Sequence, residues 1–166
     1  PNPLSKYGKS KADGEKLVLE NYEKSYIIRT SWLFGIGGNN FNKQVINWSK
    51  SKNILNIADD LVSVPTYAKD LAYFSWKLIQ TGKFGLYHIT NSGVASKYEQ
   101  AKYILEKIKW QGKIERAKAE DFKSLAKRPK YSKLSSEKIE NLLGEKIPNW
   151  KNAIDRFLKE MEFELE

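Results

Sequence analysis

Residues 7–15 read Tyr7-Gly8-Lys9-Ser10-Lys11-Ala12-Asp13-Gly14-Glu15, a run that predicts the first turns of a helix. Tyr7 and Lys11 are four residues apart, so on a helix they lie on one face, one turn from each other. A lysine cation close to a phenol stabilises the phenolate, and the positive end of a helix acts in the same direction. A tyrosine in this setting can donate a proton to a carbonyl oxygen while the carbonyl carbon receives a hydride.

The spacing alone is not specific, because it recurs at Tyr73/Lys77, Tyr98/Lys102 and Tyr103/Lys107. Those three copies are expected to reflect only helices with one solvated and one packed side. The first copy differs in its surroundings, which are an extended lead-in at residues 1–5, Gly8 directly after the tyrosine, Ser10 directly before the lysine, and then Gly14-Glu15. These surroundings make the first copy the candidate active-site segment.

The run from Asn2 to Glu15 resembles the active-site segment of the extended short-chain dehydrogenases/reductases, and most closely that of the dTDP-4-dehydrorhamnose reductase family. Further matches to that family follow in order along the chain: Ile27–Gly35, Asn40-Phe41, Asp60, Val64–Thr66, Ala68, Asp70–Ala72, Gly85–His88, Ser96–Ala101, Arg128–Leu134 and Pro148–Trp150. The ordered set spans essentially the whole chain and is far more specific than any one member.

The resemblance implies an α/β fold: the C-terminal part of a Rossmann-like parallel sheet with flanking helices, plus a small α/β substrate-binding lobe. Residues 1–31 and about 66–90 would form the sheet part, and residues about 32–65 and 91–166 mainly the substrate lobe. The chain begins with Pro1, and the family's glycine-rich dinucleotide loop would precede this segment. We therefore expect residues 1–166 to be the C-terminal portion of one reductase that lacks its N-terminal half, inactive alone.

The resemblance also implies the reaction of the intact enzyme, in which NADPH (or NADH) reduces dTDP-4-dehydro-L-rhamnose to dTDP-L-rhamnose. Tyr7 would donate the proton, and Lys11 would assist it and bind the nicotinamide ribose. The cofactor-binding residues implied by the family are Tyr7, Lys11, Thr30 and Ser31.

Three residues are expected to bind the substrate. Trp32 would contact the sugar, although a core tryptophan at a strand end is an equally good interpretation; aromatic faces pack well on sugar rings. Arg128 and Asn40 are the choices for the diphosphate, because arginine matches phosphate geometry and an exposed amide can donate to it.

Two other functions remain open. The chain could belong to another nucleotide-sugar epimerase or dehydratase of the same superfamily, although Trp32 and Val64-Pro65-Thr66 favour the reductase. It could instead be a non-catalytic regulatory subunit with this fold. The presence of Tyr7, Gly8 and Lys11 together argues against that alternative.

Composition excludes several classes of protein. The 166 residues contain no cysteine and a single histidine, His88, so no disulfide framework or metal site is expected, and His88 is interpreted as a satisfied structural residue. Asp59 and Asp60 lack the further oxygen donors of a metal site. No apolar run approaches the ~18 residues of a spanning helix and no signal peptide is visible, so no membrane partner and a cytoplasmic location are expected.

The net charge of +9 comes mostly from lysines interspersed with acidic residues, a pattern typical of solvated surfaces rather than of nucleic-acid binding. It would also steer an anionic nucleotide sugar towards the protein. Gly35–Gly38 resembles a phosphate loop, but the third glycine of a dinucleotide fingerprint would fall at Asn40. This segment is therefore predicted to be a turn.

Periodicity and capping signals predict the secondary structure. Helices are expected over about 6–22, 40–51, 67–81, 96–109, 135–143 and 150–162, and strands over 26–31, 54–57, 86–89 and 114–118. Leu17, Val18 and Tyr22 should face inward, and Arg29 should be a paired structural arginine. Thr66 and Ser96 should cap helices, the latter with Glu99 as a capping box, and Gly82 and Gly144 should end them. Without the first half of the sheet the 26–31 strand would lack a neighbour, so a homodimer is possible.

Overall fold

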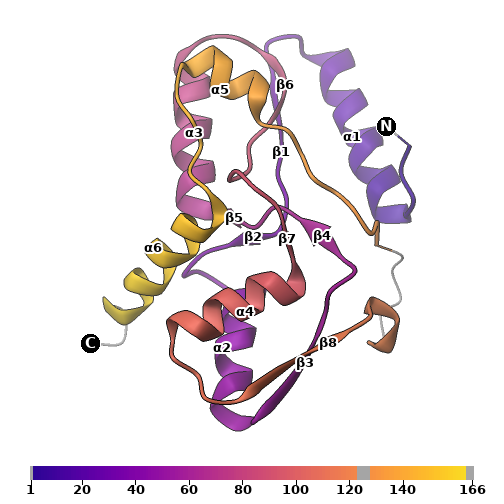
Figure 1. Cartoon of the computed structure of the whole chain (residues 1–166). Coiled ribbons are helices and arrows are strands. Elements are labelled where there is room, and N and C mark those ends of the chain that lie inside the picture. Colours follow the sequence, from indigo (N-terminus) through magenta and orange to yellow (C-terminus); the bar gives the residue numbers. More distant parts are fainter. Residues whose placement is uncertain (1, 123–127, 164–166) are drawn as a thin grey trace.

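The structure is a computed structural model that describes residues 2–122 and 128–163 (Figure 1). Its helices are α1 (Lys6–Asn21), α2 (Phe41–Ser51), α3 (Ala68–Gln80), α4 (Lys97–Lys107), the 3-10 turn Ala119–Asp121, α5 (Glu137–Leu143) and α6 (Trp150–Phe163). Its strands are β1 (Tyr26–Arg29), β2 (Leu33–Phe34), β3 (Ile54–Ala58), β4 (Val62–Ser63), β5 (Thr66–Tyr67), β6 (Gly85–His88), β7 (Ala95–Ser96) and β8 (Lys113–Ala117).

The strands pair two by two. Strands β1 and β6 are parallel, with Ile27 opposite Leu86 and Arg29 opposite His88. The pairs β2–β5 and β3–β8 are also parallel, whereas β4 and β7 are antiparallel. Parallel pairing requires crossover connections, which the helices between the paired strands provide. The predicted α/β class with parallel pairing is confirmed.

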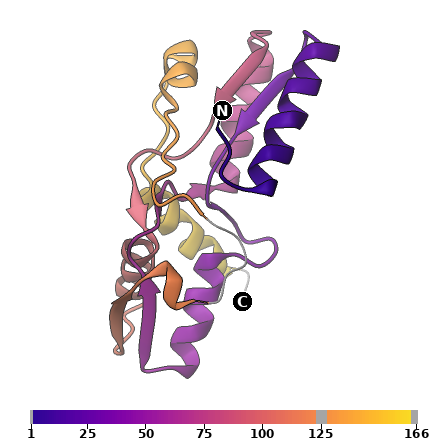
Figure 2. The ribbon, with the colours of Figure 1, turned by 90° about the vertical axis from the view of Figure 1, so that its right-hand side faces the viewer.

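Two hydrophobic cores hold the chain together. The first lies around β6, α3 and α5 and contains Phe74, Leu78, Tyr87, Ile89, Ile139 and Ile147. The second and larger core joins α2, α4 and α6 to β2, β3 and β5 through residues such as Val45, Tyr67, Ile104 and Phe157. Figures 1 and 2 show the same division, with β1, β6, α1, α3 and α5 at one end of the molecule and α2, α4, β3 and β8 at the other.

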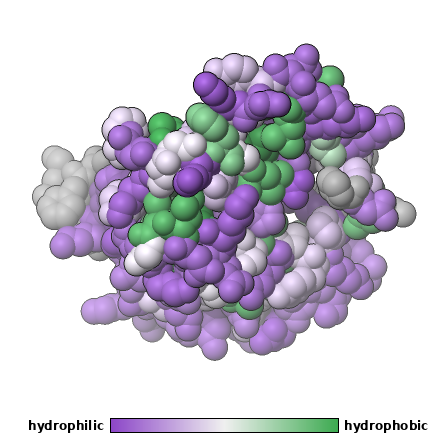
Figure 3. Space-filling view, turned by 90° about the horizontal axis from the view of Figure 1, so that it is seen from above, coloured by the Kyte–Doolittle hydropathy of each residue, from purple (hydrophilic) through white to green (hydrophobic). Residues whose placement is uncertain are grey.

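Helix α1 lies on the β1 side of the β1–β6 pair, away from α5, in both ribbon views (Figures 1 and 2). None of its residues is buried, and Leu17, Val18 and Tyr22 are 59%, 44% and 62% exposed. The prediction that these three face inward was wrong, because no described element packs on that face of the helix. Figure 3 looks down on this end of the molecule and shows hydrophobic patches between hydrophilic side chains.

Most of the predicted helix boundaries are confirmed. Ser96 and Glu99 form the expected capping box at the start of α4, and Ser136 precedes α5. Gly82 and Gly144 adopt positive φ angles of 64° and 63° at the ends of α3 and α5, a conformation that glycine adopts without strain.

The predicted cap at Thr66 was wrong. Thr66 belongs to β5, its hydroxyl donates to the Val64 carbonyl at 3.4 Å, and α3 begins two residues later without a side-chain cap. Pairing of β5 with β2 therefore outweighs the local capping preference of a threonine. Within the described residues, no helix is long and apolar enough to cross a membrane.

Candidate active site

A pocket of about 430 Å³ opens where the start of α1, the end of β1 and the segment from Arg128 onward meet. Its lining residues are Ser5, Tyr7, Trp32, Leu61, Lys97, Arg128, Pro129 and Ser132. Three of the sequence-predicted site residues, Tyr7, Trp32 and Arg128, are therefore brought together from segments far apart in the chain. In open α/β folds, ligands bind beyond the carboxyl ends of the strands, which is where this pocket lies relative to β1.

The local sequence fixes the position of Tyr7. Ser5 caps α1, because its hydroxyl oxygen accepts the backbone N–H of Gly8 at 3.1 Å. A side chain at Gly8 would place a Cβ only 3.0 Å from the Pro3 Cβ, so glycine allows the lead-in segment to fold closely against the helix. Tyr7, between these two contacts, is 76% exposed and borders the pocket. An exposed phenol is free to meet a ligand.

Trp32 has an unusual backbone conformation. Its φ angle is +42°, in the left-handed region that bulky side chains rarely adopt. Such a conformation costs on the order of 1–3 kcal/mol and tends to occur where surrounding contacts impose it, often at functional sites. The Trp32 carbonyl accepts the Thr66 N–H at 3.2 Å, and the side chain lines the pocket. The fold thus directs this tryptophan into the pocket instead of a core.

The residues predicted to bind the cofactor differ in how exposed their polar groups are and in whether those groups already have hydrogen-bond partners. Lys11 is exposed on α1 and does not line the pocket. The Thr30 hydroxyl is buried and has no hydrogen-bond partner among the described residues. The Ser31 hydroxyl, in contrast, donates to the Val64 carbonyl at 2.8 Å. Lys11 is therefore accessible to a ligand, the Thr30 hydroxyl is without a partner among the described residues but enclosed, and Ser31 already has a structural partner.

Arg29 is a paired structural arginine, as predicted. Its guanidinium binds the Glu15 carboxylate in bidentate fashion, with Nε at 2.8 Å from Oε1 and Nη2 bonded to Oε2. This hydrogen bond to Arg29 holds the pKa of Glu15 below its usual value, and the Lys11 charge adds to the effect. The pair connects the Gly14-Glu15 end of the active-site segment to β1, so it sets the position of α1 relative to the strand.

His88 lies opposite Arg29 in the β1–β6 pair. Burial lowers the pKa of His88, and the nearby Arg29 charge lowers it further. His88 has a hydrogen bond with the backbone of Ser135, but its Nε2 atom has no partner among the described residues, so the expectation of a satisfied histidine is wrong at that atom. The histidine is not part of the pocket.

Asn40 and Arg128 were both predicted to bind the diphosphate, but they lie in different places. Asn40 caps α2: its Oδ1 accepts the Lys43 N–H at 3.2 Å and its Nδ2 donates to the Gly35 carbonyl at 2.7 Å. Asn40 borders a separate depression beside Gly35 and Tyr67. Arg128 is exposed on the rim of the Tyr7 pocket.

Lys97 is a pocket residue that sequence reasoning missed. Its Nζ lies 3.6 Å from the centroid of the Trp32 ring and 4.2 Å from that of the Phe41 ring. Burial lowers the pKa of Lys97 to about 7 from its usual 10.5, and the positive charge of Arg128 contributes. One weak signal in the sequence points to it: Lys97 lies in the first turn of a helix, where the helix dipole disfavours a cation.

Lys97 should make stability depend on pH. Between about pH 7 and 10.5 the unfolded chain holds a proton on Lys97 that the folded chain has released. The free energy of unfolding should therefore rise with pH in this window by up to about 1.4 kcal/mol per unit, and Lys97→Met should remove this contribution. Urea unfolding of both proteins at pH 7 and 9 measures it. Equal pH slopes for the two proteins would contradict it.

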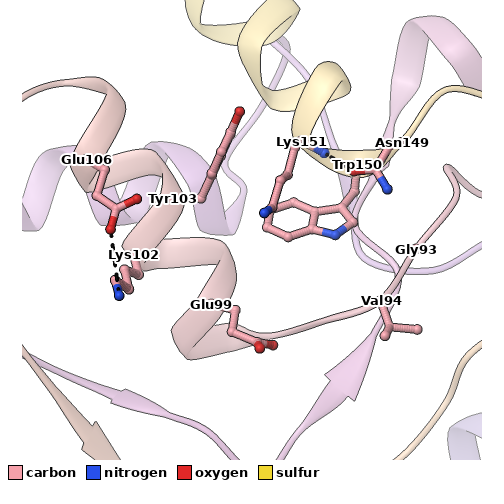
Figure 4. Close-up of a pocket in the computed structure, with 9 residues that line it drawn as sticks. All are labelled: Gly93, Val94, Glu99, Lys102, Tyr103, Glu106, Asn149, Trp150 and Lys151. Carbon is pink, nitrogen blue, oxygen red and sulfur yellow. Dashed lines mark hydrogen bonds and ion pairs between the residues drawn. The ribbon is translucent and has the colours of Figure 1, made fainter.

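A second depression, between α4 and the start of α6, is not favoured as the active site (Figure 4). Several of its polar groups already have partners. Lys102 pairs with Glu106 at 3.7 Å, the Tyr103 hydroxyl lies 3.0 Å from the Asp155 carboxylate, and Glu99 accepts the Ser96 N–H at 2.7 Å. In the described residues, no group of three or more acidic or histidine side chains could hold a metal ion.

Comparison with known proteins identifies the family. A family model described as the RmlD substrate binding domain matches residues 1–163. This chain belongs to that family. Spore coat polysaccharide biosynthesis protein SpsK of Bacillus subtilis is 38% identical to this chain over 159 residues, covering 96% of the chain and 56% of SpsK. The dTDP-4-dehydrorhamnose reductase of Aggregatibacter actinomycetemcomitans is 38% identical over 165 residues, covering 92% of the chain and 56% of that reductase.

The RmlD-type fold is also found in solved structures. The crystal structure of dTDP-4-dehydrorhamnose reductase from Bacillus anthracis, in complex with NADP, superposes with a TM-score of 0.91 at 37% identity. The match covers 96% of this chain and 57% of the other. The chain thus spans a little over half the length of the relatives it matches. The family predicted from the ordered motifs is confirmed.

Proposed function

We propose that this chain supplies the substrate-binding part and the proton-donating tyrosine of an NADPH-dependent reductase that converts dTDP-4-dehydro-L-rhamnose to dTDP-L-rhamnose. The observation that carries the proposal is the convergence of Tyr7, Trp32 and Arg128 on one pocket. An acid, a sugar-stacking aromatic ring and a cation are the groups that a reductase of a nucleotide sugar needs at its substrate.

Each of the three residues has a distinct role in this proposal. Trp32 offers an aromatic face against the sugar ring. Arg128 offers a guanidinium that matches the geometry of phosphate oxygens. The Tyr7 hydroxyl donates its proton to the C4 carbonyl oxygen as the carbonyl becomes an alcohol. Lys11, one helical turn along α1, supplies a positive charge that favours the phenolate left on Tyr7.

NADPH, when bound, supplies the hydride for C4. The chain's own residues fit part of such a cofactor: Lys11 is exposed on α1, one turn after Tyr7, and its ammonium can bind the hydroxyl groups of a ribose. The Thr30 hydroxyl lacks a partner among the described residues, but it is buried, so a ribose reaches it only if the atoms that cover it move. Ser31, whose hydroxyl is engaged by Val64, fits this role less well.

The proposal is tested by measuring NADPH oxidation in the complete protein that carries this chain. With dTDP-4-dehydro-L-rhamnose we expect one NADPH consumed per dTDP-L-rhamnose formed. The matched control is dTDP-glucose, which has no carbonyl at C4 and should not be reduced. Absence of oxidation with the keto sugar, in a folded protein that binds NADPH, would refute the proposed reaction.

The 166-residue chain by itself should bind NADPH weakly or not at all. A dinucleotide needs free backbone N–H groups at a glycine-rich turn and a helix start. Here the turn at 35–38 leads into α2, where the Asn40 side chain takes up one of the first N–H groups, and Lys43 Nζ bonds the Ile36 carbonyl. Isothermal titration of the chain with NADPH should show no saturable binding in the micromolar range, about −8 kcal/mol. Micromolar binding would contradict this prediction.

A further inference from the structure

Lys97 occupies a position that three separate elements create. It is the first residue of α4, and its ammonium lies against the rings of Trp32, which follows β1, and Phe41, the first residue of α2. Its Nζ also donates to the Gln100 Oε1 at 3.3 Å. Cation–π contacts of this kind are strongest where water is excluded. The ammonium is therefore held in one place before any ligand arrives.

The support behind Lys97 is itself fixed. Gln100 is buried, and its Nε2 donates to the Asn42 Oδ1 at 2.7 Å, which leaves the Gln100 Oε1 directed at the lysine. Asn42 is fully buried on α2. This pair connects α4 to α2 beneath the pocket, so the acceptor of the lysine's hydrogen bond is itself held in place by a buried hydrogen bond.

No negative charge balances Lys97 within the described residues. Other lysines on α4 have acidic partners: Lys102 pairs with Glu106 and Lys107 pairs with Asp155. The charged group acting on Lys97 is instead Arg128, a second cation on the same pocket. A partly desolvated cation without a counter-charge is costly, and a second cation beside it increases that cost. An anionic ligand between Lys97 and Arg128 would remove this energetic cost.

We propose that Lys97 is a specificity-determining residue of the substrate pocket and binds the diphosphate of the nucleotide sugar, together with Arg128. This inference rests on the proposed function, which names a nucleotide sugar as the substrate. It adds Lys97 as the residue that recognises the negative charge of the diphosphate. Lysine acts on phosphate as a point charge, whereas arginine acts through its planar fork, so the two cations complement each other. Trp32 then contacts the lysine and the sugar at the same site.

The proposal has a consequence for proton uptake. The titratable side chains that face Lys97 in the pocket are Tyr7 from α1 and Arg128; α2 and the Trp32 segment contribute Phe41, Asn42 and Trp32, which do not titrate. An anion beside Nζ raises the pKa of Lys97 from about 7 towards its usual 10.5. Binding above pH 7 should therefore take up a proton, and the affinity should fall as the pH rises.

The test is isothermal titration of the complete protein with dTDP, and with thymidine as an uncharged probe of the same base. Lys97→Met should weaken dTDP binding by about 10- to 100-fold, the usual effect of one hydrogen bond to a charged group, and leave thymidine binding unchanged. Lys97→Arg should restore most of the dTDP affinity. Lys102→Met, on an exposed part of the same helix, is the matched control and should change neither.

Proton uptake is measured in the same experiment, in buffers of different ionisation enthalpy at pH 8. The unaltered protein should take up protons with dTDP, and Lys97→Met should not. Unchanged dTDP binding by Lys97→Met, or equal losses for dTDP and thymidine, would overturn this inference alone. Failure of the unaltered protein to bind dTDP would overturn the proposed function as well.

Discussion

Tyr7→Phe should lower the turnover of the complete protein by at least ~10²-fold and leave its fold intact, because a positioned general acid contributes about 10²–10⁴-fold. The hydroxyl is the only group removed, and no hydrogen bond in the described structure depends on it, since Tyr7 is 76% exposed at the pocket. Substrate binding should change little. The measurement is the initial rate of NADPH oxidation at saturating substrate, with circular dichroism as the check on folding.

Tyr22→Phe is the matched control for this variant. Tyr22 directly follows α1 and is 62% exposed, but it lies at the opposite end of the helix from the pocket. The control should retain the full rate. Near-normal turnover in Tyr7→Phe would remove this tyrosine from the mechanism, whatever Tyr22→Phe does.

Asp70→Ala should lower the free energy of unfolding by about 3 kcal/mol, the low end of the range for breaking a buried ion pair. Asp70 is 7% exposed and binds the Arg156 guanidinium through two hydrogen bonds of 2.7 and 2.6 Å. It also accepts the Asn91 Nδ2 at 2.6 Å. These bonds join α3, α6 and the segment after β6. We place the effect at the low end because Arg156 is partly exposed and can be hydrated once its partner is removed.

Urea unfolding measures this loss, and Asp155→Ala provides the control. Asp155 also lies on α6, but its pair with Lys107 is about 40% exposed on both sides, and its other partner is the Tyr103 hydroxyl at 3.0 Å. Surface pairs contribute about 0–1 kcal/mol, so the control should be only slightly destabilised. Equal losses for the two variants would show that the Asp70 network is not the connection between α3 and α6 that we describe.

Local signals in the sequence predicted much of the secondary structure. The capping box at Ser96, the stop at Gly82 and the turn at Gly144 depend on residues within a few positions, so a single sequence is enough to find them. The pairing of Arg29 followed from the rule that a charge within a strand needs a partner, although only the fold shows that the partner is Glu15. The homodimer and the cytoplasmic location stay predictions.

The remaining wrong predictions have a common physical origin. Each depends on which other part of the fold contacts the residue, and the local sequence does not contain that information. The apolar pattern of Leu17 and Val18 defines a face of α1, but the pattern cannot say whether another element covers that face. Asn40 has the chemistry of a phosphate ligand, yet local hydrogen bonds with Gly35 and Lys43 occupy both of its amide atoms.

Lys97 shows the same limit at the pocket. Lys97 lies in the site only because α4, the Trp32 turn and the start of α2 come together there. These three segments are far apart in the chain, so no residue spacing predicts their contact. Tyr7, by contrast, was proposed from the sequence, because the motif that surrounds it runs over consecutive residues, and the structure places it on the same pocket as Trp32 and Arg128.

The most direct test of the site is a crystal structure of the complete protein with dTDP-L-rhamnose bound. We expect the sugar's 4-hydroxyl oxygen within hydrogen-bonding distance of the Tyr7 hydroxyl, at roughly 2.6–3.2 Å. The sugar ring should lie against Trp32, and the diphosphate should reach Lys97 and Arg128. A sugar bound with its C4 away from Tyr7, or in the depression between α4 and α6, would contradict the account.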